Sequence, residues 1–244
     1  MNRQIRARRK GLKPNVQVTR GSRGIGAAVC RLAARDGWDV SVNYTSDASA
    51  AAEVVAVVEA AGRRAVAIKA DVSDPAEVEL LFEETEKALG PIDGLVNSAG
   101  ITGLVSPLAE ARAETIARTM DINVNGTLYC CREAARRMSA RGGAIVNLSS
   151  AAANLGSPGE FVWYAASKGA VDSLTIGLSK ELGPQGIRVN AVAPGLIETD
   201  IHASAGAPER VARLVPLVPL GRSGSAEETA EPIVWLLSPA ASYV

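Results

Sequence analysis

The sequence predicts a single-domain α/β protein in which a parallel sheet carries helices on both faces. The length of 244 residues suits one such domain, and no internal repeat or low-complexity linker divides it. Short β-prone runs alternate with helical stretches throughout, which favours a parallel sheet with helices on both sides. The first β-prone run leads into the glycine-rich turn 21–26 and then into an apolar helix, an arrangement typical of this class.

We expect six strands, each a short β-prone run. They are residues 16–19, 39–43, 64–70, 92–96, 144–148 and 187–192. The patterns between and after them predict helices. These helices are residues 24–36, 46–61, 75–89, two stretches within 110–140 that meet around 121–126, 162–182 and 225–237. Their ends carry expected signals, because Pro75 stands in the first turn of one helix and Gly62 follows the end of another.

Composition excludes several classes of function. The formal net charge is zero, which argues against a general nucleic-acid binder, and no run of eighteen apolar residues predicts a membrane span. No secretory signal is recognisable, so we expect a cytoplasmic protein that binds neither nucleic acid nor a membrane. The cysteines Cys30, Cys130 and Cys131 lack C-x-x-C spacing, so neither a disulfide framework nor a zinc site is expected. With His202 as the single histidine, no metal site is predicted.

The first fourteen residues depart from this neutrality. Residues 1–13 carry six lysine and arginine side chains and no acid. We expect residues 1–14 to be a disordered basic arm and residues 15–244 to form the domain. The alternatives are an arm that binds nucleic acid or an anionic membrane, and an altered reading of the first codons.

A candidate acid–base device lies in the helix predicted for residues 162–182. Tyr164 and Lys168 are four residues apart and therefore share one helix face. A nearby ammonium group favours the phenolate, so we expect Lys168 to lower the pKa of Tyr164 from its usual value of about 10. The phenol could then exchange a proton with an alcohol or carbonyl oxygen, which the hydroxyl of Ser150 would hold by a hydrogen bond. Taken alone, the pair fits an ordinary surface helix better.

Two segments indicate a dinucleotide site. In residues 18–26 a strand passes through a glycine turn into a helix, so that backbone N–H groups and the helix dipole point at an anion. Residues 94–100 form an apolar strand that ends in small residues, which allow a cofactor to approach the backbone at the carboxyl end of a parallel sheet. An ordinary loop or tight turn is the alternative for each segment taken alone.

Together and in this order, these segments resemble the short-chain dehydrogenase/reductase family from about residue 16 to residue 244. The motifs that carry the resemblance are the glycine turn, Asp71-Val72, residues 97–100, Asn123, Ser150, Tyr164 with Lys168, and Pro194-Gly195. Residues 147–150, 155–160 and 233–238 look like a bacterial group of uncharacterised, sugar-dehydrogenase-like oxidoreductases. The resemblance implies a Rossmann-type, doubly wound parallel sheet and hydride transfer between a nicotinamide cofactor and a small alcohol or carbonyl substrate.

The resemblance also implies roles for individual residues. Tyr164 would be the general acid/base, Ser150 would position the substrate oxygen, and Lys168 would also bind the nicotinamide ribose. The backbone of Asn123 would hold a water that links Lys168 to solvent, although alone it is an ordinary residue at a helix break. The implied cofactor contacts are Gly21, Ser22, Arg23, Gly24, Ile25, Gly26, Asn43, Asp71, Val72, Asn97, Ala99, Gly100, Tyr164, Lys168, Pro194, Gly195, Ile197 and Thr199. Asp71 taken alone is a turn or helix-cap residue.

The sequence favours NADP over NAD as the cofactor. NAD-selective relatives carry an acid at the end of the second strand, where residues 42–45 have none. Arg23 in the glycine turn could offer its planar cation to a 2′-phosphate.

Two departures from the family pattern bear on activity. Arg20 stands where relatives have a glycine, and its bulk is expected to weaken NADP(H) binding, although it could also swing outward and help to bind phosphate. Relatives continue with a seventh strand that is missing here at the C-terminus, so either the sequence is cut short or the protein is a damaged relative. A homotetramer or dimer is the family expectation, and the missing strand puts the tetramer in doubt. The alternative function is a catalytically weak relative that acts as a structural or regulatory partner.

The substrate pocket is expected to include Asn154, Leu155, Trp163 and His202, beneath a mobile lid at residues 198–215. Such a mixed apolar and hydrogen-bonding cavity would suit sugars, keto-esters or small cyclic ketones.

Overall fold

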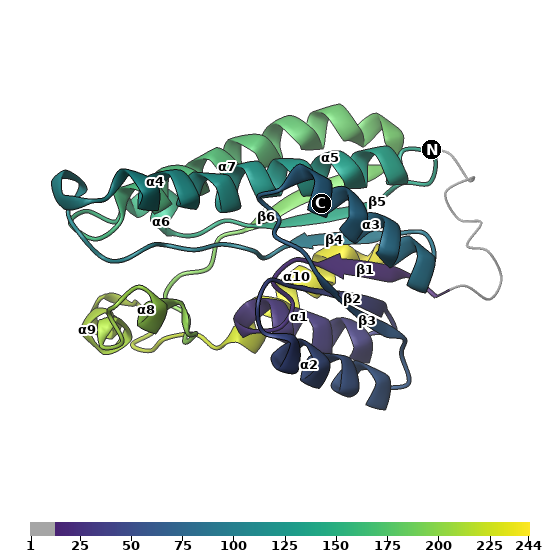
Figure 1. Cartoon of the computed structure of the whole chain (residues 1–244), viewed down its shortest axis with the longest axis horizontal. Coiled ribbons are helices and arrows are strands. Elements are labelled where there is room, and N and C mark those ends of the chain that lie inside the picture. Colours follow the sequence, from purple (N-terminus) through teal and green to yellow (C-terminus); the bar gives the residue numbers. More distant parts are fainter. Residues whose placement is uncertain (1–12) are drawn as a thin grey trace.

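The computed structural model describes residues 13–244, in which six parallel strands form one sheet (Figure 1). The strands are β1 Asn15–Val18, β2 Asp39–Tyr44, β3 Ala65–Lys69, β4 Gly94–Asn97, β5 Gly143–Leu148 and β6 Ile187–Val192. They lie in the order β3-β2-β1-β4-β5-β6, so the predicted doubly wound parallel sheet of six strands is confirmed. The order reverses between β1 and β4, and the crevice beside the carboxyl ends of two such strands is where open α/β sheets bind ligands. The basic arm predicted for residues 1–14 lies almost entirely outside the described residues.

Helices cover both faces of the sheet (Figure 1). One face carries α1 (Gly24–Arg35), α2 (Ala48–Ala60) and α10 (Ala226–Leu237). The other face carries α3 (Pro75–Leu89), α5 (Gly126–Met138) and α7 (Val162–Leu182), with α4 (Ala113–Met120) preceding α5. Each face has its own apolar cluster of valine, leucine, isoleucine and alanine side chains. The short helices α6 (Ala152–Leu155), α8 (Ile201–Ser204) and α9 (Arg210–Leu214) follow the carboxyl ends of β5 and β6.

Helices α3 and α10 begin at side chains that accept hydrogen bonds from free backbone N–H groups. The carboxylate of Asp74 accepts from the N–H groups of Ala76 and Glu77, and Pro75 occupies the first turn of α3 as predicted. Ser225 and Glu228 form a reciprocal capping box at the start of α10. These caps place the helices where the sequence pattern predicts them, within about two residues.

A π-helical turn at Asp121–Asn125 joins α4 to α5. The sequence predicts a junction between two helical stretches here, and the structure keeps the chain helical through it. Such turns insert an extra residue into a helix and are frequent at functional sites. The extra residue widens the helix and turns Asn123 fully inward, toward α7 and the loop that follows β4.

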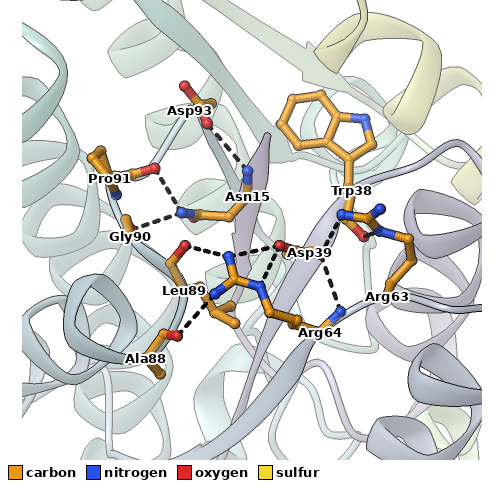
Figure 2. A network of polar contacts seen from close by, with 10 residues as sticks. All are labelled: Asn15, Trp38, Asp39, Arg63, Arg64, Ala88, Leu89, Gly90, Pro91 and Asp93. Atoms are coloured by element: carbon orange, nitrogen blue, oxygen red, sulfur yellow. Dashed lines mark hydrogen bonds and ion pairs between the residues drawn. The ribbon is translucent and has the colours of Figure 1, made fainter. Parts of the chain in front are cut away.

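A polar network closes the amino end of the sheet (Figure 2). Asn15, the first residue of β1, donates from its side-chain amide to the carbonyl oxygens of Gly90 and Pro91 at 2.7 and 2.6 Å. The buried carboxylate of Asp39 accepts from Arg63 and from the backbone N and Nε of Arg64 at 3.0 and 2.9 Å. Burial by itself raises the pKa of Asp39, but the bonds from Arg64 and the charge of Arg63 outweigh it and lower that pKa.

A second polar group lies inside the core, where Gln17 is fully buried in the middle of β1. Its Oε1 accepts from the hydroxyl of Thr85 at 2.6 Å, and that hydroxyl lies 2.8 Å from the hydroxyl of Ser41. The Nε2 of Gln17 has no hydrogen-bond partner among the described residues.

Cys30, Cys130 and Cys131 are buried free thiols, and burial raises the pKa of both Cys30 and Cys131 to about 12. Within residues 13–244, no helix has the length and apolar character to cross a bilayer. That part of the chain also contains no cluster of three or more metal-ligating His, Cys, Asp or Glu side chains.

Candidate active site

A cavity of about 420 Å³ opens beside the carboxyl ends of the strands, between the glycine turn after β1 and the segment that follows β6. It brings together eleven of the residues singled out from the sequence. They are Arg23, Gly24, Ile25, Gly100, Ser150, Tyr164, Lys168, Pro194, Gly195, Ile197 and Thr199. These residues come from five separate segments of the chain, so their meeting in one cavity is a product of the fold.

Tyr164 and Ser150 form the polar centre of this cavity. Tyr164 lies in the first turn of α7, beside Ser150, which lies just beyond β5 and whose hydroxyl favours the phenolate of Tyr164. Its ring also meets the ring of Phe161 edge-on, with centroids 5.6 Å apart, which fixes the direction of the phenol. A hydroxyl pair held in this way can grip one oxygen atom of a substrate.

Lys168 lies one helical turn beyond Tyr164, as the spacing predicts, with its Nζ 5.8 Å from the centre of the tyrosine ring. The Nζ donates a hydrogen bond of 2.6 Å to the carbonyl oxygen of Leu148, the last residue of β5. Burial lowers the pKa of Lys168 to about 8. The ammonium therefore stands on the cavity floor, ready to exchange this carbonyl bond for bonds to a ligand.

The expected lowering of the pKa of Tyr164 is wrong for this structure. Burial raises the pKa of Tyr164, and the bond with Ser150 and the charges of Arg210 and Arg20 oppose that rise without overcoming it. Spacing along the helix correctly placed Lys168, but it carries no information on how far the phenol is removed from water.

Asn123 braces the site from behind. Its Oδ1 accepts from the backbone N of Ile101 and its Nδ2 donates to the carbonyl oxygen of Ile101, both at 2.9 Å, while Nδ2 also donates to Ser167 at 3.0 Å. Asn123 thereby ties the π-turn both to the loop after β4 and to the helix that carries Tyr164. Its backbone carbonyl accepts from the hydroxyl of Thr127 at 2.8 Å.

The glycine turn packs as tightly as its sequence predicts. A Cβ at Gly26 would lie 2.3 Å from the carbonyl oxygen of Arg20, so only glycine fits this position. Gly24 has a φ of 52° and faces the methyl group of Thr199 across the cavity. Among residues 13–244 no side chain caps the start of α1 at Arg23, so the first backbone N–H groups of that helix are left for an anion.

Asn43 and Thr19 hold this turn from below. The buried Asn43 accepts from the backbone N of Arg20 at 3.1 Å and donates to the carbonyl oxygen of Ala70 at 2.9 Å. The hydroxyl of Thr19 accepts from the backbone N of Ser98 and of Ala99, each at 2.9 Å. Both side chains form hydrogen bonds within the protein. Asn43 therefore positions the glycine turn, and Thr19 ties the end of β1 to the loop after β4, a role that the sequence motif did not reveal.

Several expected cofactor contacts lie outside the cavity lining. These are Gly21, Ser22, Gly26, Asn43, Asp71, Val72, Asn97 and Ala99. The carboxylate of Asp71 pairs with Arg118 of α4 and accepts from Ser73. The amide of Asn97 points into the core, where it donates to Asn147 at 2.9 Å. The side chains of Asp71 and Asn97 are therefore structural in this structure, which leaves only their backbones for a ligand.

The structure places an acid, Asp47, near the end of β2 and just outside residues 42–45, the stretch in which the sequence has no acid. Asp47 lies three residues beyond the strand, where its carboxylate caps α2 by accepting from Ala50 at 3.0 Å. Its other oxygen lies 3.8 Å from Arg23. Asp47 is thus already engaged, and Arg23 stands on the cavity wall as a half-exposed cation.

The far wall of the cavity is mostly apolar. Leu155 and His202 line it as expected, whereas Asn154 is exposed and Trp163 is buried, with its Nε1 bonded to the carbonyl oxygen of Thr102 at 2.7 Å. The remaining apolar wall comes from side chains around the short helices. They include Phe161, Ile201, Ala205, Leu214, Leu217 and Val218.

An ion-pair cluster fastens this wall to the body of the protein. Glu160, just before α7, accepts from Arg210 at 2.9 Å and from Arg213, both in α9. Arg210 also lies over the ring of Phe161, 4.9 Å from its centroid. Two residues of the segment expected as a lid, Arg210 and Arg213, are therefore tied to Glu160 beside the cavity.

Arg20 is a feature whose direction the sequence left open. Its side chain turns inward, where Nη1 donates to the carbonyl oxygen of Gly100, three residues beyond the end of β4. It lines the same cavity as Tyr164 and Lys168. Apart from this guanidinium, the cavity fits a dinucleotide: an uncapped helix start, a cationic Arg23 and glycine backbone at Gly24 and Gly195 border it.

Comparison with known proteins agrees with this geometry. A family model described as enoyl-(acyl carrier protein) reductase matches residues 20–244. An uncharacterised oxidoreductase, YgfF, from Escherichia coli K12 is 50% identical over 231 residues, covering 93% of this chain and 94% of its own. A 3β-hydroxysteroid dehydrogenase from Eggerthella lenta is 41% identical over 232 residues, covering 94% of this chain and 88% of its own.

A solved structure shares the fold. A short-chain dehydrogenase from Burkholderia cenocepacia J2315, crystallised with NADP, superposes with a TM-score of 0.88 at 35% identity, covering 95% of this chain and 93% of that one. Sequence, sheet order and site geometry agree: the chain is a member of the short-chain dehydrogenase/reductase family of oxidoreductases.

Proposed function

We propose that this chain transfers hydride between NADP(H) and the CH–OH or C=O group of a small alcohol or carbonyl compound, with Tyr164 as general acid/base. The observation that carries the proposal is the convergence of Tyr164, Ser150 and Lys168 on one cavity that also contains the uncapped start of α1. An acid–base group and an anion site in the same cavity meet the needs of a nicotinamide-dependent oxidoreductase.

Each side chain has a task in the reaction. The bound cofactor supplies or accepts the hydride, so the protein has to manage the proton. In the reducing direction, the hydroxyls of Ser150 and Tyr164 donate hydrogen bonds to the carbonyl oxygen, and the Tyr164 proton passes to that oxygen as it becomes an alcohol. The Lys168 ammonium stabilises the phenolate that this leaves. In the oxidising direction, the phenolate takes the proton back.

Asn123 has a positioning task in this scheme. Its side-chain amide fixes Ile101 and Ser167, and so holds the π-turn against the helix of Lys168. A water on its backbone would then connect Lys168 with solvent, so that the proton taken from Tyr164 is replaced.

Arg23 supports NADP as the cofactor. Its guanidinium stands on the wall beside the start of α1, where a 2′-phosphate could form bidentate bonds to it. Asp47 is 3.8 Å away and partly balances this charge, but it is held by the N–H of Ala50. The relative from Burkholderia holds NADP in its own crystal structure.

The apolar far wall favours a substrate with a hydrocarbon body. Leu155, Phe161 and Leu217 offer no hydrogen bonds from their side chains, so a polyhydroxylated sugar would lose its contacts with water there. Small cyclic ketones, keto-esters and the matching alcohols suit this wall better than sugars do. The relative named for 3β-hydroxysteroids points toward the same chemistry.

A catalytically weak relative that serves as a structural or regulatory partner is the second candidate. The inward-turned Arg20 favours it, because the guanidinium takes up part of the cavity. The expected homotetramer or dimer and the cytoplasmic location stay predictions.

Fluorescence titration of the protein with NADPH and with NADH tests the proposal. We expect saturable binding with a lower Kd for NADPH, followed by NADPH oxidation with cyclic ketones or keto-esters. Preference for NADH would refute the assignment of NADP, and binding of neither would leave the second candidate.

A further inference from the structure

We propose that Arg20 is a displaceable plug in the protein's own cofactor site, and that a dinucleotide must move its guanidinium away from Gly100 in order to bind across the cavity. This inference rests on the proposed function. It concerns how the site is opened, and it assigns to Arg20 a task that a glycine at that position could not perform.

The backbone conformation of Arg20 directs its side chain into the cavity. Its φ of 50° lies in the left-handed region, which a side chain other than glycine or asparagine rarely adopts. Its N–H is held by Asn43 at 3.1 Å, and its carbonyl oxygen packs against Gly26. With both ends held, the Cβ points to the cavity, which the side chain of Arg20 then lines.

The guanidinium ends beside the reacting groups. It donates from Nη1 to the carbonyl oxygen of Gly100, and a Cβ at Gly100 would lie only 3.6 Å from Nζ of Lys168. The charge of Arg20 also acts to lower the pKa of both Tyr164 and Lys168, whose side chains line the same cavity. The plug therefore stands next to the end of the cavity where the proton is exchanged.

A dinucleotide has to cross this position. Its diphosphate belongs at the uncapped start of α1, while its nicotinamide must reach the substrate carbon next to the oxygen held by Tyr164 and Ser150. Gly24, Gly100 and Tyr164 line one cavity, and the guanidinium lies in it against Gly100, so we expect the dinucleotide to pass over this position. The adenosine half does not need this path, because it lies on the other side of the diphosphate.

The site also offers reasons for the plug to be displaceable. Burial, followed by the charge of Arg23, lowers the pKa of Arg20. The environment of the guanidinium therefore disfavours its positive charge. Asp200, at the start of α8, opposes that lowering and offers a partner of opposite charge. An arriving diphosphate offers another, so the guanidinium can leave Gly100 without losing all its partners.

The sign of the effect separates a plug from a simple charge. Arg20 is a cation beside a site for an anion, so long-range attraction alone predicts that its removal weakens NADPH binding. Obstruction predicts the opposite, because a variant without the side chain has nothing to displace. Arg23→Ala is the matched control, because it also removes a cation from the glycine turn. Unlike Arg20, Arg23 pairs outward with Asp47 and makes no bond to Gly100.

The experiment compares wild-type protein with Arg20→Gly, Arg20→Asn and Arg23→Ala. Glycine and asparagine both tolerate the left-handed backbone, so a folding defect in one does not compromise the test. Kd is measured by fluorescence for NADPH, and by competition or calorimetry for 2′,5′-ADP, which has the adenosine half and no nicotinamide. Circular dichroism confirms that each variant is folded.

We expect both Arg20 variants to bind NADPH at least about ten-fold more tightly than wild type, with 2′,5′-ADP changed by less than about two-fold, whereas Arg23→Ala binds both ligands more weakly. An unchanged or weaker NADPH affinity in both Arg20 variants would overturn the plug and leave the proposed function standing. Equal tightening of NADPH and 2′,5′-ADP would overturn it too, because the effect would then come from the turn's backbone. If no protein binds NADPH, the proposed function fails, and the plug fails with it.

Discussion

At the amino end of the sheet, the buried carboxylate of Asp39 is shared by Arg63 and Arg64, whereas at the carboxyl end the buried ammonium of Lys168 bonds to the neutral carbonyl oxygen of Leu148. The two charges differ in consequence. The pKa of Asp39 is lowered, so its folded environment favours the charge, and the pKa of Lys168 is lowered to about 8, so its environment disfavours the charge.

The backbone shows the same contrast. The network of Figure 2 bonds side chains to carbonyl groups left over at strand and helix ends, and so ties the layers together. At the carboxyl end, Arg20 and Ser157 have positive φ angles, and both border the cavity. Unfavourable charge and backbone conformation are therefore gathered at the end where ligands bind, and favourable pairing at the other end holds the sheet. Changes at the carboxyl end should alter activity, and changes at the amino end should alter stability.

Tyr164→Phe should have the largest effect. It removes the only group that the proposed mechanism uses to move the proton, so kcat with NADPH and a ketone should fall by about 10³-fold. The free energy of unfolding and the Kd for NADPH should stay nearly constant, because the ring and its contact with Phe161 are kept. Residual activity within ten-fold of wild type would show that another group transfers the proton.

Asp39→Asn tests the amino end. Removing this charge leaves two arginines without their partner, and we expect the free energy of unfolding in urea to fall by about 2–4 kcal/mol at pH 7. The Kd for NADPH should be unchanged, because the cavity lies at the other end of the sheet. A variant as stable as wild type would contradict the proposal that this network holds the amino end of the sheet together.

The same pair of proteins gives a pH test. Because the pKa of Asp39 is lower in the folded state, its stabilisation is complete above the unfolded value of about 4 and is lost as the pH falls through the folded value. The stability gap between wild type and Asp39→Asn should therefore be constant from about pH 5 to 7 and shrink below about pH 4. A gap that does not change with pH would mean that the carboxylate charge is not its source.

Lys168→Met should show the opposite sign at the carboxyl end. In the folded state Lys168 loses its proton above about pH 8, whereas in the unfolded state it stays protonated up to about pH 10.5. Below pH 8 the folded protein therefore carries a buried charge that its environment disfavours. The variant should thus be more stable than wild type at pH 7, by about 1–3 kcal/mol, and the gap should narrow as the pH rises from 8 to 10.5. Activity should be lost. A destabilised variant at pH 7 would show that the bond to Leu148 outweighs the burial of charge.

Gln17→Leu should have the smallest effect, between the two ends. It removes a buried amide nitrogen that has no partner within residues 13–244, while Thr85 can still donate to the carbonyl oxygen of Leu81. We expect a gain of about 1 kcal/mol in unfolding free energy, with no change in NADPH binding. Gln17→Glu is the control, because a charge of the same shape should be strongly destabilising.

The fold could be read from the sequence because its signals are local. The helix over 162–182 and the strand over 187–192 have the predicted bounds, since a long helical pattern is ended by Gly183 and Pro184. The short helices α8 and α9 escaped prediction, because four or five residues are too few to show a helical period. Their places depend on contacts such as that of Arg210 with Glu160, fifty residues away.

The site could be predicted where a role depends on the type of residue. It could be predicted less well where the role depends on the direction in which a side chain points. Tyr164, Lys168 and Ser150 reach the cavity as expected. Asp71 and Asn97 turn their side chains away from the cavity, because they bond to Arg118 and Asn147. The inward direction of Arg20 depends on the carbonyl of Gly100, eighty residues along the chain, and no local pattern reports that distance.

The order of the strands has a consequence for how the chain is made. The central strand β1 lies between β2 and β4, and α10 covers α1. Arg31 and Arg35 of α1 pair with Glu227 and Glu231 of α10, each across 196 residues of sequence. Part of the apolar face of α1 thus stays exposed on the nascent chain until α10 is synthesised. Contacts of such long separation close slowly, so the nascent chain should depend on chaperones through most of translation and reach its native core only after α10 has emerged.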